Sequence, residues 1–429
     1  MSDFVGPSLR KGSGLNRALD LGQPIFGLVL GGVAPVGPPV AYALGQVVLL
    51  GAPSDADAYG LTAAYDAANS VRVRHHIERF FGYAPNSLLA VMVVAQSNTL
   101  AAMANGAGSP LEQLLLSEVT DRRCFNVGLV RNPEDPGEYT PTYTNGLDAD
   151  AILAAQRGSA LMAGLVEQGI YCESVLVEAR LAWALRNTNY TGVHNNRGLA
   201  AEYAMMVTLA DPAVQALDAT MVNYAEVGAV LGMTAVRQVA ECLGSVRVEN
   251  PPAAFAGQES YPLTRADKGW FASCSLSNGE SFYTLTEADK TALRQKGYIY
   301  GGKYEGYPGF YLNDSHTCTS ASSDYAYQED NRVWATAARI VRRALLPQMK
   351  GRFRTEGGAL TPSAAAYLQG LAENRLAQQM ANQLSGWRVL VSGPDFASTG
   401  GVGLEVRYER DGILRTLTGT VNAVTNLNA

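Results

Sequence analysis

The sequence predicts an α/β protein: a largely parallel-sheet α/β domain, a C-terminal α+β domain, and an extended arm at each end. Short, continuously apolar segments alternate with helical patterns through the first half, which is typical of βαβ units around a parallel sheet. The pattern changes after a linker, ENPPAAFAGQES, and both chain ends lack a helical period. The predicted parts are residues 1–22 (N-terminal arm), 23–255 (α/β domain), 256–412 (C-terminal α+β domain) and 413–429 (C-terminal strand or arm).

The composition limits the class of protein. A chain of 429 residues is long enough for two to three domains. Its formal net charge of −6 argues against a general nucleic-acid binder. Only 17% of the residues are charged, which indicates either a surface covered by partners or a large, well-buried enzyme.

Cysteine use and hydropathy predict where the chain is made. The five cysteines lie far apart without a CxxC pair, as expected for free thiols in a reducing cytoplasm. The first residues, MSDFVGPSLRKGSG, contain no apolar leader segment, and no run reaches the roughly 18 apolar residues of a membrane span. We therefore expect a soluble protein made in the cytoplasm, with no membrane insertion.

The first part of the chain contains an arm followed by strands. Residues 1–22 are rich in Gly and Ser, so we expect a segment that is disordered or orders only against a partner. The next segment, PIFGLVLGG, is the first strand candidate. Continuous apolar runs predict further strands at 46–52, 88–96, 124–132 and 172–180.

Helical patterns separate these strands. Apolar residues from Ala63 to Phe80 are spaced for one helical face. The segment SPLEQLLLSEVTD begins with Ser109 as an N-cap and Pro110 in the first turn. The stretch 148–168 reads as a long Ala- and Leu-rich helix, and 227–244 as the last clear helix of this domain.

The second part is predicted to be α+β. A helix in LTEADKTALRQK is followed by an aromatic-rich hairpin that turns near Gly306. A basic helix and a second helix, from Thr361 to Leu384, come next. GWRVLVSG is a strand, and the closing segment is predicted as a hairpin with an Asp411-Gly412 turn.

No motif in the chain predicts catalysis. GLVLGGV has neither the phosphate-loop spacing nor a following helix, so it reads as a turn or a close-packed strand end. His75 and His76 are adjacent in a helix and point roughly 100° apart, which does not suit a shared metal. His316 and His194 read as loop residues, although the polar neighbours of His316 leave a metal possible.

Acidic pairs and strand ends give no catalytic set either. SDADA and LDADA each lie where a loop enters a helix, where acids cap free N–H groups. The strand ends carry Ala52-Pro53, Gln96-Ser97 and Asn132-Pro133, without a nucleophile beside a base. We therefore expect no catalytic, cofactor-binding or metal-binding residues and no enzyme, with a cytoplasmic α/β enzyme as the alternative.

A basic helix lies near the C-terminal end of this acidic chain, in EDNRVWATAARIVRRALLPQMKGRF. Its apolar residues form a stripe at helical spacing, and its arginines lie mainly off that stripe. The arginines form either a solvated basic face on a core helix or a contact with an acidic protein partner. Nucleic acid is disfavoured because the chain is acidic elsewhere.

In order and spacing, three segments resemble the contractile tail sheath family of phage tails and contractile injection systems. Residues 46–103, from QVVLLGA to NTLAAM, resemble the first α/β unit of that family. Residues 127–150 resemble its middle, where a strand leads through a proline-rich loop into a helix. Residues 297–347 resemble its C-terminal core: a Gly-Tyr hairpin, a polar loop, an Asn-Arg pair and a helix ending in Leu-Leu-Pro.

The resemblance implies a structural subunit that polymerises as stacked six-fold rings around an inner tube and contracts to drive the tube through a target envelope. It implies partners that are further copies of the chain, the inner tube, and baseplate and terminator proteins. Assembly would occur in the bacterial cytoplasm, and the product would be a virion tail or a contractile injection particle. A tube or baseplate protein is disfavoured, since tube proteins are usually much shorter and mostly β.

The resemblance also implies particular contacts. Extended arms add strands to the sheets of neighbours, and the residues expected to do so are Phe4, Val5, Leu9, Leu414, Leu417 and Val421. The basic helix would hold an acidic inner tube through Arg339, Arg342 and Arg343. We expect that reversing these three charges spares folding but weakens sheath–tube assembly. The short polar tail NAVTNLNA, however, departs from a long C-terminal arm.

Overall fold

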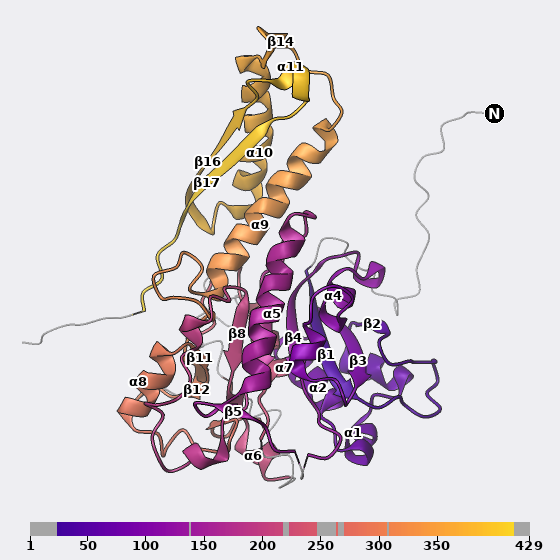
Figure 1. The fold of residues 1–429 in the computed structure, drawn as a ribbon, viewed down its shortest axis with the longest axis vertical. Coiled ribbons are helices and arrows are strands. Elements are labelled where there is room, and N and C mark those ends of the chain that lie inside the picture. The colour runs from indigo at the N-terminus through magenta and orange to yellow at the C-terminus, as the bar shows by residue number, and fades with distance from the viewer. Residues whose placement is uncertain are drawn as a thin grey trace, which may run out of the picture.

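The computed structural model describes residues 24–136, 139–217, 223–246, 263–264, 270–306 and 309–415. Figure 1 shows an α/β body and, beyond it, an elongated part built from two long helices and a β-hairpin. The predicted arm at 1–22, the linker at 249–260 and the chain after Arg415 lie outside the described residues.

A seven-stranded sheet forms the centre of the body, in the order β11-β8-β7-β4-β1-β3-β2. Every neighbouring pair in it is parallel except β2 with β3, so the largely parallel sheet is confirmed. All eight residues of β1 are buried, as expected for a strand covered on both faces. The strands are β1 (Ile25–Gly32), β2 (Val47–Leu50), β3 (Leu88–Ala95), β4 (Cys124–Val130), β7 (Ser174–Glu178), β8 (Ala204–Val207) and β11 (Tyr298–Ile299).

Helices cover both faces of this sheet. The helices of the body are α1 (Ala63–Asn69), α2 (Val73–Tyr83), α3 (Leu100–Met103), α4 (Pro110–Leu115), α5 (Ala149–Val166), α6 (Pro212–Gln215), α7 (Val227–Val236) and α8 (Glu287–Gln295). Ile25 of β1 belongs to one core cluster, with residues of α4 and α5. Phe26, pointing the other way, belongs to a second cluster, with residues of α2 and α7.

Local sequence explains several helix boundaries. Ser109 accepts a hydrogen bond from the Glu112 backbone N–H, so the predicted N-cap of α4 is confirmed. The helical pattern between Ala63 and Phe80 is two helices, because Ser70 adopts a left-handed backbone with φ of 51°. Helices α2 and α7 pack closely: a Cβ on Gly228 would lie 2.4 Å from the His76 carbonyl oxygen.

The chain after the linker returns to the body. Strand β11 joins the edge of the main sheet, and β10 (Ser275–Leu276) pairs with β9 (Leu209–Ala210). Packing therefore continues across the predicted boundary at residue 255, and the domain ranges given above stay a prediction. The predicted hairpin is present as β12 (Gly301–Gly302) paired with β13 (Tyr311–Leu312), and Gly306 has a φ of 73° between them.

The elongated part contains α9 (Gln328–Leu345), α10 (Pro362–Met380), β16 (Leu384–Ser392) and β17 (Gly403–Arg410). Shorter elements at its far end are β14 (Thr355–Glu356), β15 (Ala359–Leu360) and α11 (Phe396–Thr399). Its own small core joins residues of both helices and both strands. The predicted Asp411-Gly412 hairpin stays a prediction: β17 pairs with β16, residues 411–415 form no strand, and the rest of its second strand lies outside the described residues.

Candidate functional site

The base of α9 is where the elongated part meets the body and where the described chain ends. Arg415 pairs with Glu329 in the first turn of α9, and its Nε lies 3.3 Å from an oxygen of Asp314. Its guanidinium lies 3.5 Å from the centre of the Tyr327 ring. Ser315 Oγ donates to the other Glu329 oxygen. Arg415, at the start of the predicted C-terminal arm, is therefore fixed to the base of α9.

Arg415 influences the pKa values of the two acids at this base, Glu329 and Asp314. Burial raises the pKa of Glu329 to about 7, although Arg415 acts in the opposite direction. Burial also acts to raise the pKa of Asp314, but His316 and Arg415 hold that pKa below its ordinary value. A second ion pair joins Arg410, at the end of β17, to Asp330.

The basic helix is bound to the body through one buried carboxylate. Glu173, just before β7, pairs with Arg332 at 3.3 Å and also with Arg339. Asn126 Nδ2 donates to the same carboxylate at 2.7 Å, and Arg339 also donates to the Tyr171 carbonyl oxygen. Burial acts to raise the pKa of Glu173, but the two guanidinium groups hold it below its usual range.

The three arginines predicted to hold an inner tube therefore lie in different surroundings. Arg339 faces the body, with only 19% of its side chain exposed. Arg342 donates to the Gly169 carbonyl oxygen at 2.6 Å, and Arg343 is exposed. We revise the expectation that all three can be reversed without loss of folding, because Glu at 339 would face Glu173.

The two edges of the β16–β17 hairpin differ in whether their outward backbone groups have partners. Side chains of α10 cover the outer edge of β16: Glu373 accepts from the Val389 N–H, and Gln369 donates to the Val389 carbonyl oxygen. Because Val389 faces Val406 in the ladder, the backbone groups of Val406 and Leu404 point outward from β17. Within the described residues no strand pairs with this edge of β17.

The structure describes one of the six predicted arm residues. Leu414 is 77% exposed and follows β17 without strand structure. The other predicted arm residues, Phe4, Val5, Leu9, Leu417 and Val421, lie outside the described residues.

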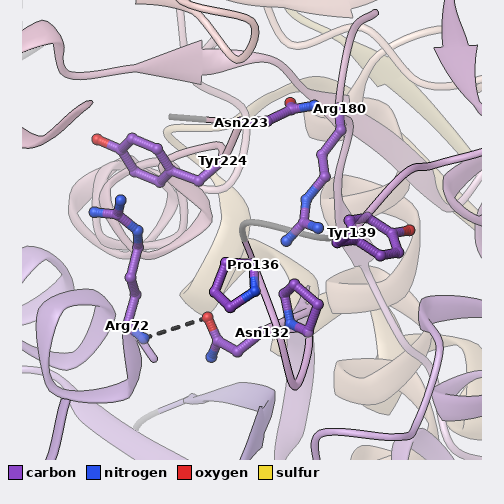
Figure 2. A pocket seen from close by; sticks show the side chains of 8 residues that line it. Arg72, Asn132, Pro136, Tyr139, Arg180, Asn223 and Tyr224 are labelled. Atoms are coloured by element: carbon purple, nitrogen blue, oxygen red, sulfur yellow. Dashed lines mark hydrogen bonds between the residues drawn. The ribbon is translucent and has the colours of Figure 1, made fainter. Parts of the chain in front are cut away.

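A small cavity lies beyond the carboxyl ends of the central strands (Figure 2). Its volume is about 40 Å³, and its lining is Arg72, Asn132, Pro133, Pro136, Tyr139, Arg180, Asn223 and Tyr224. Asn132 connects its floor to the sheet: its side chain donates to the Gly31 carbonyl oxygen at 2.7 Å and accepts from the Arg72 N–H at 3.3 Å. None of these lining residues is a carboxylate, thiol, imidazole or aliphatic hydroxyl, so they supply no nucleophile with a base.

The adjacent histidines His75 and His76 lie close to a buried acid, Glu226. His75 Nε2 lies 2.8 Å from Glu226, and His75, His76 and Glu226 could together surround a cation. The Gly228 N–H, however, donates to Nδ1 of His76, and Arg79 already lies 3.5 Å from Glu226. Burial lowers the pKa of His76 to about 3, so it stays neutral. We interpret the cluster as an ion-pair network that joins α2 to α7.

The predicted capping acids are at helix starts. Asp55 accepts from the backbone N–H groups of Gly51 and Ala52, and Asp148 accepts from that of Asp150. His316 does not lie free in a loop: Arg197 contacts its Nδ1 at 2.6 Å, and burial lowers its pKa to about 4. Among the described helices, none is long and apolar enough to cross a membrane.

Comparison with known proteins gives a family and a fold. The anti-feeding prophage baseplate contains a chain that matches with a TM-score of 0.54 at 13% identity, over 98% of this chain and 100% of that chain. A chain of the contracted PVC sheath complex, from an extracellular contractile injection system, matches with a TM-score of 0.54 at 10% identity, over 99% of both chains. No curated protein sequence matches.

Two family descriptions match the sequence itself. Residues 22–316 match the N-terminal domain of the DUF2586 family, and residues 324–428 match its C-terminal domain. The division between them falls just before α9, at the base described above. The chain belongs to the DUF2586 family, and it has the fold of contractile sheath proteins.

Proposed function

We propose that the protein is a structural subunit of a contractile sheath, which polymerises as stacked six-fold rings around an inner tube and contracts to drive that tube through a target envelope. The observation that supports this most is the full-length fold match to chains of contractile injection systems, which includes the elongated part. The cavity lining supports a structural role over the alternative of a cytoplasmic enzyme, because it offers no nucleophile with a base.

The sheath would be held together by exchanged strands. The outer edge of β17 offers outward backbone groups at Leu404 and Val406, while α10 covers the edge of β16. An arm of a neighbouring copy, from residues 1–22 or 413–429, would pair with β17 by β-augmentation. Repeating one such head-to-tail contact generates an open helix of subunits.

The remaining partners belong to the same proposal. The inner tube would meet the exposed basic residues at the far end of α9, and baseplate and terminator proteins would bind the two ends of the sheath. Assembly would take place in the bacterial cytoplasm, and the finished sheath would belong to a virion tail or a contractile injection particle.

Deleting residues 1–22 is expected to abolish polymerisation, because each subunit then has no N-terminal strand for the edge of its neighbour. The measurement is negative-stain electron microscopy of the purified chain, intact and deleted, with and without a candidate inner-tube protein. Tubes or rings from the intact chain, with none from the deleted chain, would support both the sheath function and the role of the arm. Tubes from both chains would reject the role of the arm, and no polymer from the intact chain with tube protein would reject the sheath.

Replacing Arg343 with Glu is expected to weaken co-assembly with an acidic inner tube several-fold while leaving the fold intact, since the side chain is exposed on the last turn of α9. The measurement is the amount of tube protein that sediments with the sheath. Arg375→Glu is the matched control, because Arg375 is exposed on α10 of the same part. Equal losses in both variants would show an effect of net charge and contradict a specific contact.

A further inference from the structure

Two acids at the base of α9, Glu329 and Asp314, share one arginine, Arg415. The side chain of Glu329 is 4% exposed and that of Asp314 is 11% exposed, so both carboxylates lie largely out of water. Of the described cations, Arg415 is the one that pairs with Glu329. Two like charges that share a single cation repel each other, and this repulsion favours a proton on one of them.

The surroundings of the two acids indicate which of them takes that proton. Asp314 accepts from the Ser315 backbone N–H at 2.8 Å and from the Cys242 thiol at 3.2 Å, and these bonds favour its charged form. Glu329 is the more buried of the two acids, and it accepts from the Ser315 hydroxyl at one oxygen and from Arg415 at the other. Its greater burial makes Glu329 the acid that binds the proton.

The pKa values of the groups that face Glu329 agree with this assignment. Burial raises the pKa of Glu329 to about 7 and that of Cys242 well above its ordinary value. Burial also acts to raise the pKa of Asp314, but His316 and Arg415 hold it below its ordinary value. His316 itself lies beside Arg197, and burial lowers its pKa to about 4. Of these groups, Glu329 is therefore the one that changes charge near neutral pH.

Proton binding to Glu329 and the contact with Arg415 oppose each other. Arg415 lowers the pKa of Glu329, so by linkage a proton on Glu329 weakens the hold on Arg415 to the same extent. The hold is complete above the pKa that Glu329 has without Arg415, which is higher than about 7, and it is lost as the pH falls through about 7. Asp314 and the ring of Tyr327, 3.5 Å from the guanidinium, are the contacts that then remain.

We propose that the base of α9 is a pH-sensitive latch for the C-terminal end of the chain: the carboxylate of Glu329 holds Arg415 against α9, and protonation of Glu329 releases it. The latch itself does not depend on the proposed sheath function, because all of its residues belong to one chain. What it would regulate does rest on that function, since an arm released from its own α9 becomes available to pair with a neighbouring copy.

Trypsin can report the state of the latch, because it cleaves after an arginine only when that side chain leaves its contacts and enters the protease. The test is limited digestion of the purified full-length chain at about pH 6 and about pH 9, below the concentration at which it polymerises. Cleavage after Arg415 is measured by mass spectrometry relative to cleavage after Arg352, which is exposed and lies outside the helices and strands.

The ratio of Arg415 to Arg352 cleavage is expected to be about tenfold higher at the lower pH, the factor that corresponds to one pKa unit. Cleavage follows the population of the released state as long as the latch recloses faster than trypsin cuts. A ratio that does not change with pH would overturn the latch, whether or not the chain forms a sheath.

Two variants of neighbouring acids on α9 assign the effect to one carboxylate. Glu329→Gln is expected to give the high ratio at both pH values, because it removes the charge that holds Arg415. Asp330→Asn is the matched control: burial raises the pKa of Asp330 too, but Asp330 pairs with Arg410. It should respond to pH as the native chain does. A pH response that persists in Glu329→Gln, or disappears in Asp330→Asn, would contradict the role of Glu329.

Ser315→Ala keeps the proposal testable if Glu329→Gln does not fold. This variant removes the hydroxyl that donates to Glu329, and the loss of that hydrogen bond raises the pKa of Glu329. The pH at which the cleavage ratio changes should therefore move upward by several tenths of a unit. An unchanged transition would mean that Glu329 does not control the release of Arg415.

Discussion

Replacing Glu173 with Ala is expected to lower the free energy of unfolding by about 3–5 kcal/mol, the usual loss when one partner of a buried ion pair is removed. Glu173 lies within the body and is the shared acceptor for Arg332 and Arg339 of α9 and for Asn126 of β4. Its side chain is 5% exposed, so alanine would leave Arg332 buried without its carboxylate. The measurement is urea unfolding followed by tryptophan fluorescence.

The matched control for this prediction is Glu173→Gln, which keeps the shape and a carbonyl acceptor but removes the charge. It should lose less, about 1.5–3 kcal/mol, the range for one hydrogen bond to a charged group. If the alanine variant unfolds at the same urea concentration as the native chain, then α9 is not held by this carboxylate.

The effect of Glu173 should also depend on pH in a defined direction. The folded-state pKa of Glu173 lies below the ordinary value, since Arg339 and Arg332 outweigh the effect of burial. The carboxylate therefore stabilises the fold fully above the unfolded-state pKa, near 4.3. This contribution is lost as the pH falls through the lower folded-state pKa, so the native and alanine chains should converge in acid.

Replacing Leu404 with Pro is expected to raise the protein concentration needed for polymerisation by tenfold or more. Proline removes a backbone N–H, and the N–H of Leu404 points outward from β17, away from β16. The hairpin should survive, whereas an added strand would lose a hydrogen bond and meet the proline ring. The measurement is sedimentation of the polymer over a concentration series, with circular dichroism to verify the fold.

Leu404→Thr is the matched control, because it removes the apolar side chain but keeps the N–H. It should polymerise close to the native concentration, since Leu404 is already 44% exposed. Normal polymerisation of the proline variant would mean that the edge of β17 is not where neighbouring chains pair.

The central sheet could be predicted from the sequence because its strands are buried on both faces. Runs such as LLAVMVVAQ identify strands without any knowledge of their neighbours, and Ser109 identifies a helix start by a purely local hydrogen bond. The partner of β17, by contrast, could not be predicted from the Asp411-Gly412 turn signal. A turn signal is local, but β17 pairs with β16, and the choice between two pairings depends on the core under the hairpin.

The contacts at the base of α9 could not be predicted, because they join residues far apart in the chain. Arg339 and Glu173 are 166 positions apart, so the helical pattern placed Arg339 on a solvent face while the fold turns it toward the body. The cavity lining was missed for the same reason. Asn132 was visible at a strand end, but nothing local connects it with Arg72 or Arg180.

The ion pairs of Arg410 and Arg415 decide how a load on the C-terminal arm would enter the molecule. The described chain ends at the base of α9, where Arg415 pairs with Glu329 and Arg410 pairs with Asp330, so the proposed arm would begin there. A pull along the arm is therefore borne first by these two anchors and then by the helix they hold. In a polymer linked through such arms, tension in one subunit would rotate the elongated part of that subunit about its base.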